Sequence, residues 1–131
     1  MSKKINVIYV DDERNLLELV KIFLERNEDI SVEALGSIKQ AIEFINEKHP
    51  SIDVIISDYQ MPGMSITEFL ENIKDFKIPF IIFTGRNREE IVFEIDDKTI
   101  FYLQKGGIPI AQLYVNLADK IRQIAQTHLN T

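Results

Sequence analysis

Five short apolar runs, rich in β-branched residues and separated by amphipathic stretches, constrain the fold of this chain more than any other feature. The runs are Ile5–Val10, Ile30–Leu35, Val54–Ser57, Pro79–Phe83 and Ile100–Leu103. Their length and composition predict β-strands. Apolar residues at helical spacing predict helices over Glu13–Arg26, Ser37–Lys48, Ser65–Ile73, Glu89–Ile95 and Ile110–His128. Regular alternation of strand and helix predicts an α/β fold, with a parallel sheet covered by helices on both faces.

The apolar pattern also suggests which strands are central. Ile5–Val10, Val54–Ser57 and Pro79–Phe83 are apolar on both faces and are predicted to form the sheet centre, whereas Ile30–Leu35 alternates and suits an edge. Two serines, Ser37 and Ser65, each precede a Gln or Glu by three residues, which is the capping-box form of a helix start. At 131 residues, the chain is predicted to be a single domain over residues 1–131.

Composition excludes several classes of function. The formal net charge is −6 and the 15 Lys and Arg residues form no cluster, which argues against direct binding of nucleic acid. The chain has no cysteine, so disulfides and thiolate chemistry are excluded. No apolar stretch approaches the length of a membrane span, and the start of the chain lacks the apolar core of a signal peptide. We therefore expect a cytoplasmic protein with no membrane association.

Polar residues follow four of the predicted strands at their C-terminal ends. Asp11 and Asp12 follow the first strand, Asp58 the third, Thr84 the fourth and Lys105 the fifth. The C-terminal ends of parallel strands meet at one rim of the sheet, so these groups are expected to converge on one crevice. The mutual repulsion of three carboxylates there would require a cation to join them.

The donor types at this rim predict a particular chemistry. Asp12 and Asp58 can bind a hard divalent cation directly, with Asp11 reaching it through water. Oxygen ligands without imidazole or thiolate favour Mg²⁺. Lys105 supplies a positive charge for a phosphoryl oxygen or for Asp58, and Thr84 supplies a hydroxyl donor. A carboxylate nucleophile beside Mg²⁺ and an ammonium group indicates an aspartyl-phosphate site.

The motifs around these residues resemble the receiver domain of two-component response regulators, the CheY-like domains. The resemblance covers essentially the whole chain. It is carried by the segments Asp11-Asp12-Glu13, Asp58-Tyr59-Gln60-Met61-Pro62-Gly63-Met64, Thr84-Gly85 and Phe101-Tyr102-Leu103-Gln104-Lys105. It implies a doubly wound (βα)5 flavodoxin-like fold with the strand order 2-1-3-4-5.

The resemblance also implies a function for several residues. Asp58 would be the phosphoacceptor, taking a phosphoryl group from a sensor histidine kinase or a histidine phosphotransfer protein. Mg²⁺ would be bound directly by Asp12, Asp58 and the backbone carbonyl of Gln60. Thr84 and Tyr102 would form a switch pair that responds to the phosphoryl group. Such a domain is not an enzyme beyond assisting its own phosphorylation and dephosphorylation.

Three segments depart from the family pattern. Ser65-Ile66 stands where the family usually has Asp-Gly, and Gly106-Gly107 follows Lys105 where the family commonly has a cis proline. Residues 94–100 replace the Gly-Ala pair that normally precedes the fifth strand. The predicted helix over Glu89–Ile95 with the fifth strand and final helix forms the face that most receivers use for dimerisation or partner docking, so the resemblance implies a homodimer or partner interface there.

Alternative interpretations remain open at this stage. Asp11 and Asp12 could also cap the first helix, since Asp favours helix starts. The domain could be a Mg²⁺-dependent aspartyl-phosphate phosphatase or phosphotransferase of the haloacid dehalogenase type. That class places a second Asp two residues after the nucleophile, where this chain has Gln60. A degenerate receiver acting only as a scaffold is a third interpretation. His49 and His128 are predicted to be solvated surface residues away from the site.

Overall fold

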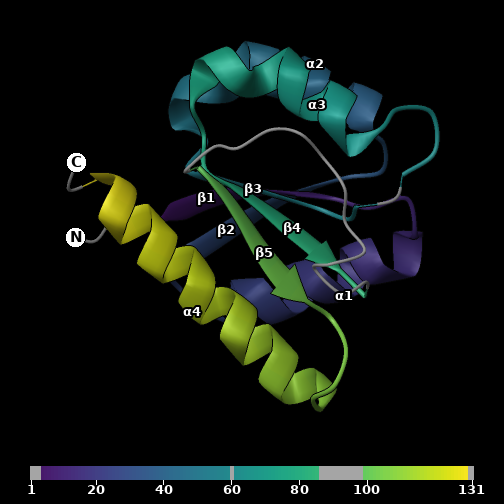
Figure 1. Ribbon diagram of the computed structural model, residues 1–131. Helices are drawn as coiled ribbons and strands as arrows, with labels where there is room; N and C mark the ends of the chain where they lie inside the picture. The colour runs from purple at the N-terminus through teal and green to yellow at the C-terminus, as the bar shows by residue number, and fades with distance from the viewer. Residues whose placement is uncertain (1–3, 60, 86–98, 130–131) are drawn as a thin grey trace.

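The computed structural model describes residues 4–59, 61–85 and 99–129. These residues form a five-stranded sheet with the order β2-β1-β3-β4-β5, in which every pairing is parallel. The strands are β1 (Ile5–Val10), β2 (Ile30–Leu35), β3 (Val54–Ser57), β4 (Phe80–Thr84) and β5 (Ile100–Gln104). Helices cover both faces of the sheet (Figure 1). The predicted doubly wound α/β fold and its strand order are confirmed, including the edge position of β2.

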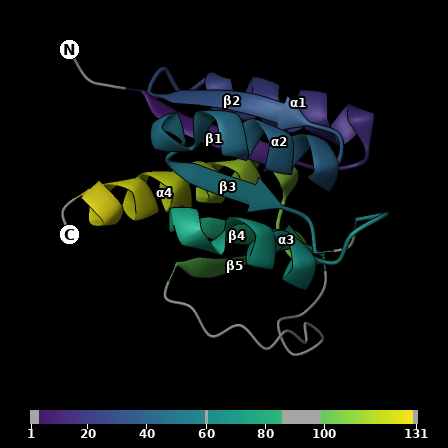
Figure 2. The same cartoon turned by 90° about the horizontal axis from the view of Figure 1, so that it is seen from above.

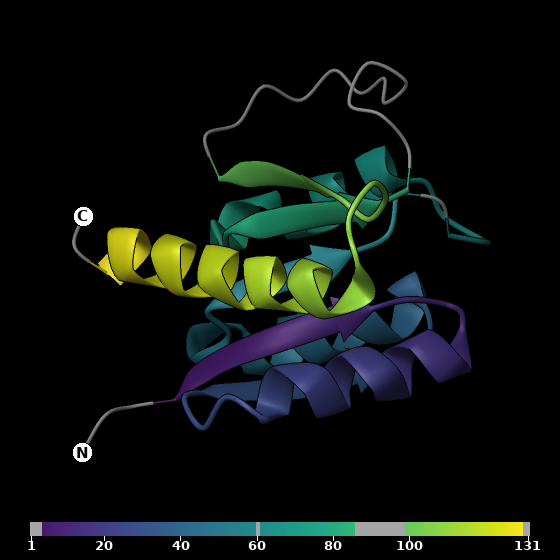
Figure 3. The same ribbon diagram turned by 90° about the horizontal axis from the view of Figure 1, so that it is seen from below.

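Helices α2 (Ile38–Lys48) and α3 (Ile66–Ile73) lie side by side on one face of the sheet (Figure 2). Helices α1 (Arg14–Glu25) and α4 (Ile110–Leu129) cover the other face (Figure 3). Short 3₁₀ helices over His49–Ser51 and Lys74–Phe76 follow α2 and α3. The helix predicted over residues 89–95 lies outside the described residues. Helix α4 therefore corresponds to the predicted final helix.

Strand alternation divides the core into two layers. Along β1, Val7 and Tyr9 pack in the layer beneath α1 and α4, whereas Ile8 and Val10 pack in the layer beneath α2 and α3. Successive side chains on a strand point to opposite faces, so this parity also sets the direction of the residues that follow each strand. This alternation of side chains along the strands positions the site.

Both predicted capping serines begin a helix. The Ser37 Oγ accepts a hydrogen bond from the Gln40 backbone N–H at 3.1 Å, and the Ser65 Oγ accepts one from the Glu68 N–H at 3.1 Å. Each bond satisfies a backbone donor that the first turn of a helix leaves unpaired. Ser65 thus starts α3 at the position where this chain departs from the family pattern.

The surface prediction for His49 is wrong. Its ring stacks on Phe76 with the centroids 4.3 Å apart, and its Nδ1 is buried without a hydrogen-bond partner in the described part of the chain. The side chain of His128 lies outside what the structure describes. Across residues 4–59, 61–85 and 99–129, no helix combines the length and apolar character needed to cross a lipid bilayer.

Arg122 connects α4 to the turn between α1 and β2. Its guanidinium donates to both carboxylate oxygens of Asp29, at 2.8 and 3.1 Å, and to the Asn27 Oδ1 at 2.6 Å. A second carboxylate, that of the exposed Asp119, lies 3.3 Å from the guanidinium one turn earlier in α4. The hydrogen bond from Arg122 lowers the pKa of Asp29 below its usual range. The forked geometry makes this pair stronger than an ordinary surface ion pair.

We expect Arg122→Met to lower the free energy of unfolding at pH 7 by about 1 kcal/mol, a value that includes screening of these partly exposed groups. Because the pKa of Asp29 is lowered in the folded state, this contribution is present above the ordinary aspartate pKa of about 4 and is lost as the pH falls below it. Urea denaturation at pH 7 and at pH 3 measures both effects. Asp119→Asn is the control and should change the free energy of unfolding by less than about 0.5 kcal/mol; equal losses from the two variants would contradict the prediction.

Candidate functional site

The structure brings three of the predicted site residues into contact. The Lys105 Nζ lies 3.4 Å from the Asp58 Oδ2 and 3.6 Å from the Asp11 Oδ2. Asp11 and Asp58 directly follow β1 and β3, whose register pairs Val10 with Ser57. Asp11 and Asp58, which come directly after this pair, therefore emerge beside each other. Two carboxylates in this position repel each other, and the ammonium group between them compensates that repulsion.

Asp11 is the buried member of this group. It is only 1% exposed, and its Oδ1 accepts a hydrogen bond from the Glu13 backbone N–H at 3.0 Å. Its Oδ2 accepts a hydrogen bond from the Tyr9 hydroxyl at 2.8 Å. A buried carboxylate requires such donors because it has lost its hydration. Asp11 therefore accepts a bond at the start of α1, although the residue at the N-cap position is Glu13.

The sequence pattern places Tyr9 in the apolar strand Ile5–Val10 and does not identify it as a site residue. It is 1% exposed and precedes Asp11 by two residues, so both side chains lie on the same face of the strand. Burial, followed by the negative charge of Asp11, raises the pKa of the Tyr9 phenol. The hydroxyl therefore stays protonated and remains a donor. A tyrosine two positions before an aspartate at a strand end is the sequence signal that could have found it.

Asp58 and Lys105 form the more accessible part of the site, with side chains 24% and 22% exposed. The Asp58 N–H donates to the Val10 carbonyl at 3.4 Å, which extends the pairing of β3 with β1 to this residue. The Lys105 N–H donates to the Thr84 carbonyl at 2.8 Å, and the Lys105 Nζ lies 5.1 Å from the centre of the Phe83 ring. Lys105 is thus held at its backbone and at its side chain, while the Asp58 carboxylate remains partly accessible to solvent.

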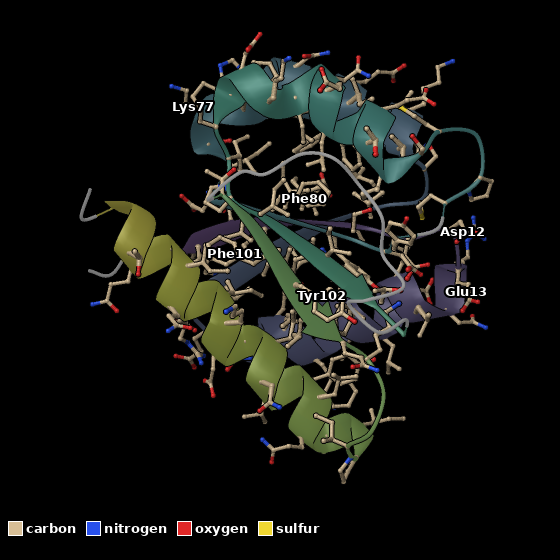
Figure 4. All side chains as sticks on the ribbon, viewed as in Figure 1. Asp12, Glu13, Lys77, Phe80, Phe101 and Tyr102 are labelled. Atoms are coloured by element: carbon tan, nitrogen blue, oxygen red, sulfur yellow. The ribbon has the colours of Figure 1, made fainter. Side chains whose placement is uncertain are left out.

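Asp12 lies apart from this group. Its side chain is exposed at the start of α1, beside Glu13, at the outer edge of the molecule (Figure 4). It borders a shallow hollow with Gly36, Ser37 and Gln40 from the loop after β2 and the start of α2. The direct metal-ligand function of Asp12 stays a prediction. Gln60, whose backbone carbonyl was predicted as another ligand, lies outside the described residues.

Thr84 and Tyr102 lie on the opposite face of the sheet from Asp11 and Lys105. Thr84 is buried at 3% exposure, and Tyr102 is half-buried and packs against the core layer of α2 and α3. Tyr102 pairs with Ile82 across β4 and β5, so Thr84 is its diagonal neighbour on the same face. In Figure 4, Tyr102 lies near the C-terminal end of β5, whereas Phe101 lies on the side of α4. The predicted switch pair is therefore adjacent in space, and its function stays a prediction.

The loop after Lys105 differs from the cis-proline form of the family. The described residues contain no cis peptide bond, and Gly107 has a φ of 88°. A residue with a Cβ rarely adopts this left-handed conformation, so glycine is required at position 107 for the chain to turn into α4. Pro109 then accepts the first helical hydrogen bond, from the Leu113 N–H at 3.0 Å.

The donor set at the rim fits Mg²⁺ as a cation that is shared with a ligand. Within the described ranges, no three carboxylate or imidazole groups gather closely enough to hold a metal ion alone. Mg²⁺ is usually held by one or two carboxylates, with waters and phosphate oxygens completing its octahedron. Asp58, with Asp11 beside it, matches that pattern of partial coordination.

Comparison with known proteins agrees with this geometry. The family model of the response regulator receiver domain matches residues 7–107, and the chain belongs to that family. The matched segment contains Tyr9, Asp11, Asp58, Thr84 and Lys105. The fold and the residues at the strand ends are therefore those of a receiver domain of response regulators in two-component systems.

Among curated proteins, the chain is 36% identical over 90 residues to the response regulator GtcR of Aneurinibacillus migulanus, covering 68% of this chain and 35% of that protein. It is 33% identical over 120 residues to the transcriptional regulatory protein BtsR of Shigella flexneri, covering 91% of this chain and 48% of that protein. The chain thus spans less than half the length of either relative.

Among solved structures, the chain is similar to a receiver domain protein from Clostridium thermocellum, with a TM-score of 0.74, 25% identity and coverage of 97% and 99% of the two chains. The receiver domain of an HD domain-containing protein from Pseudomonas fluorescens Pf-5 gives a TM-score of 0.80 at 19% identity, covering 98% and 100%. The receiver domain of Saccharomyces cerevisiae Ssk1, solved with the histidine phosphotransfer protein Ypd1, gives a TM-score of 0.74 at 20% identity, covering 98% and 93%.

We expect Lys105→Met to lower the free energy of unfolding by about 1–3 kcal/mol, because it leaves a buried and a partly buried carboxylate without their shared cation. Urea denaturation without divalent cations measures this loss. Lys21→Met is the control: the Lys21 ammonium pairs with Glu25 at 3.6 Å and donates to the Val32 carbonyl at 2.7 Å, and its side chain is 42% exposed. Its loss should stay below about 1 kcal/mol. A smaller loss for Lys105→Met than for Lys21→Met would contradict the prediction.

Proposed function

We propose that this chain is a phosphorylation-switched receiver domain in which Asp58 accepts a phosphoryl group from phosphohistidine. The observation that carries the proposal is the Lys105 ammonium 3.4 Å from the Asp58 carboxylate at the open rim of the sheet. A partly exposed carboxylate beside a fixed positive charge can attack an incoming phosphoryl group. The buried Asp11 lacks that access, since it is 1% exposed.

In the transfer step, a lone pair of the Asp58 carboxylate forms a new P–O bond as the P–N bond of phosphohistidine breaks. The electron pair of that bond leaves with the imidazole nitrogen, and the imidazole is neutral when its other nitrogen carries a proton. The Lys105 ammonium interacts with the phosphoryl oxygens, where negative charge is concentrated. Water later attacks phosphorus, releases inorganic phosphate and restores the Asp58 carboxylate, so the domain resets itself and is not a conventional enzyme.

Bound Mg²⁺ would neutralise charge on the phosphoryl oxygens and bring Asp58 and the donor together. Asp12 and Asp58 would hold it directly, with Asp11 acting through water and the Gln60 carbonyl completing the protein ligands. The residues of this chain supply the rest of the site: Lys105 interacts with the phosphoryl group, and the buried Asp11 keeps Lys105 at the rim.

The phosphorylated state would be read through Thr84 and Tyr102. The Thr84 hydroxyl would move toward the phosphoryl oxygen, and the ring of its diagonal neighbour Tyr102 would turn inward. The surface formed by β5 and α4 would then dock a partner or a second copy of the chain. We propose one receiver domain over residues 1–131, acting in the cytoplasm without direct contact to nucleic acid or membrane.

The proposed donor is a sensor histidine kinase or a histidine phosphotransfer protein. A structural neighbour, the receiver domain of Ssk1, was solved in complex with the phosphotransfer protein Ypd1. The likeness shows a shared fold, and the accessible Asp58 supports the same kind of donor for this chain.

Asp58→Asn should abolish incorporation of phosphate from acetyl phosphate or phosphoramidate in the presence of Mg²⁺, because an amide oxygen is a poor nucleophile. Incorporation is measured by intact mass, and the acyl phosphate is identified by its release with hydroxylamine. Asp75→Asn, which removes an exposed carboxylate from the surface after α3, is the matched control and should label at the wild-type rate. Labelling of Asp58→Asn at that rate would exclude Asp58 as the acceptor.

Removal of divalent cations with EDTA should also abolish labelling, and readdition of Mg²⁺ should restore it, because the carboxylates at the rim repel the phosphoryl group.

Beryllofluoride with Mg²⁺ should change the ¹H–¹⁵N spectrum around Thr84 and Tyr102. An unchanged spectrum at saturating Mg²⁺ and beryllofluoride would favour the degenerate scaffold instead.

A further inference from the structure

The hydroxyl of Tyr9 is a polar group inside the apolar layer beneath α1 and α4. Its neighbours in that layer include Val7, Val20 and Leu117, and the side chain itself is 1% exposed. A phenylalanine would fill the same space without the cost of burying a hydroxyl. The hydroxyl instead donates a hydrogen bond to the Asp11 Oδ2, at 2.8 Å.

That same oxygen faces Lys105. The Asp11 Oδ2 lies 3.6 Å from the Lys105 Nζ, and the Lys105 Nζ lies 3.4 Å from the Asp58 Oδ2. The three contacts form a continuous series from the phenol through the buried carboxylate and the ammonium to the phosphoacceptor. The Asp11 Oδ1 is held separately by the Glu13 N–H at 3.0 Å, so the orientation of the Asp11 carboxylate is fixed at both oxygens.

We propose that Tyr9 is a positioning residue for phosphoryl transfer, which holds the Asp11 carboxylate so that Lys105 stays beside Asp58. The proposal rests on the proposed function of Asp58 as acceptor. The uncharged phenol donates a hydrogen bond to the Asp11 carboxylate and so supplies one of the donors that this buried group requires. Lys105 is then shared between Asp11 and Asp58 rather than drawn entirely to the buried carboxylate.

Without the hydroxyl, the buried Asp11 carboxylate would depend more strongly on the ammonium group. Lys105 would move toward Asp11 and away from the acceptor, and the developing charge on the phosphoryl group would lose its closest fixed cation. Displacements of about 1 Å in such a group can lower a rate by up to about a hundredfold. Because Tyr9→Phe removes no carboxylate from the site, the affinity of the site for Mg²⁺ should change much less than the rate.

The test is Tyr9→Phe, which removes one oxygen and keeps the ring in the core. At saturating Mg²⁺, its rate of labelling by phosphoramidate should fall by about five- to twentyfold. Its Mg²⁺ dissociation constant, from isothermal titration calorimetry without any phosphodonor, should stay within about threefold of wild type. A labelling rate within twofold of wild type would overturn the proposal, as would a Mg²⁺ dissociation constant weakened tenfold or more.

Two further measurements distinguish positioning from a general loss of structure. Tyr114→Phe removes a second hydroxyl from the same core layer, whose pKa is raised by burial and by the charge of Asp11. Since no hydrogen bond joins Tyr114 to Asp11 in the described part of the chain, this variant should label at the wild-type rate. In an Asp11→Asn background, Tyr9→Phe should have no further effect on the rate, because the two residues act through one contact. An equal additional loss in that background would show that Tyr9 does not act through Asp11.

A direct signature in the wild-type protein covers the case in which Tyr9→Phe does not fold. A buried phenol proton bonded to a carboxylate exchanges slowly with water, so the Tyr9 hydroxyl should give a resolved downfield ¹H resonance with a nuclear Overhauser effect to its own ring. The absence of such a resonance in the folded wild type would contradict the proposal. Failure of wild type itself to label would instead reject the proposed function.

Discussion

The ammonium of Lys105 between the carboxylates of Asp11 and Asp58 is the interaction on which the site depends. The register of β1 and β3 pairs Val10 with Ser57, so the fold itself forces the two following aspartates together. Lys105, from the far end of the sheet order, supplies the compensating charge. One carboxylate of the pair is buried and the other is accessible, which separates an anchoring function from a reactive one.

Strand parity gives the rim two chemically different sides. Tyr9, Phe83 and Leu103 belong to the layer of α1 and α4, and the contacts of Asp11 and Lys105 place them on that side. Tyr102 belongs to the layer of α2 and α3, and Thr84 shares its face. The group that would fix the phosphoryl charge and the pair that would report it are thus on opposite faces of one sheet. A phosphoryl group on Asp58 would then be detected on one face while the anchoring residues on the other stay in place.

The strands, their order and the convergence of their ends followed from the sequence because burial of both sheet faces leaves a clear apolar pattern. The contacts within the site depend on the direction of individual side chains, which an apolar pattern does not show. Asp12 follows Asp11 by one residue and so emerges in another direction, at the exposed start of α1. The strand pattern indicates that the ring of Tyr9 is buried, but it does not show which group the hydroxyl contacts. His49 is predicted to be at the surface from its place at a helix end away from the site, although its aromatic ring packs on Phe76.

The glycines after Lys105 show how this chain holds its lysine without a proline. Gly107 turns the backbone at a φ of 88°, and the position of Lys105 is fixed by a hydrogen bond of its own backbone. The Lys105 N–H is bonded to the Thr84 carbonyl at 2.8 Å, so the two residues share a peptide contact across β4 and β5. A shift of the Thr84 backbone would therefore be transmitted to Lys105. Lys105, beside the proposed acceptor Asp58, and Thr84, of the predicted switch pair, are thus linked by one backbone hydrogen bond, which would join the chemistry at Asp58 to the face that would communicate it.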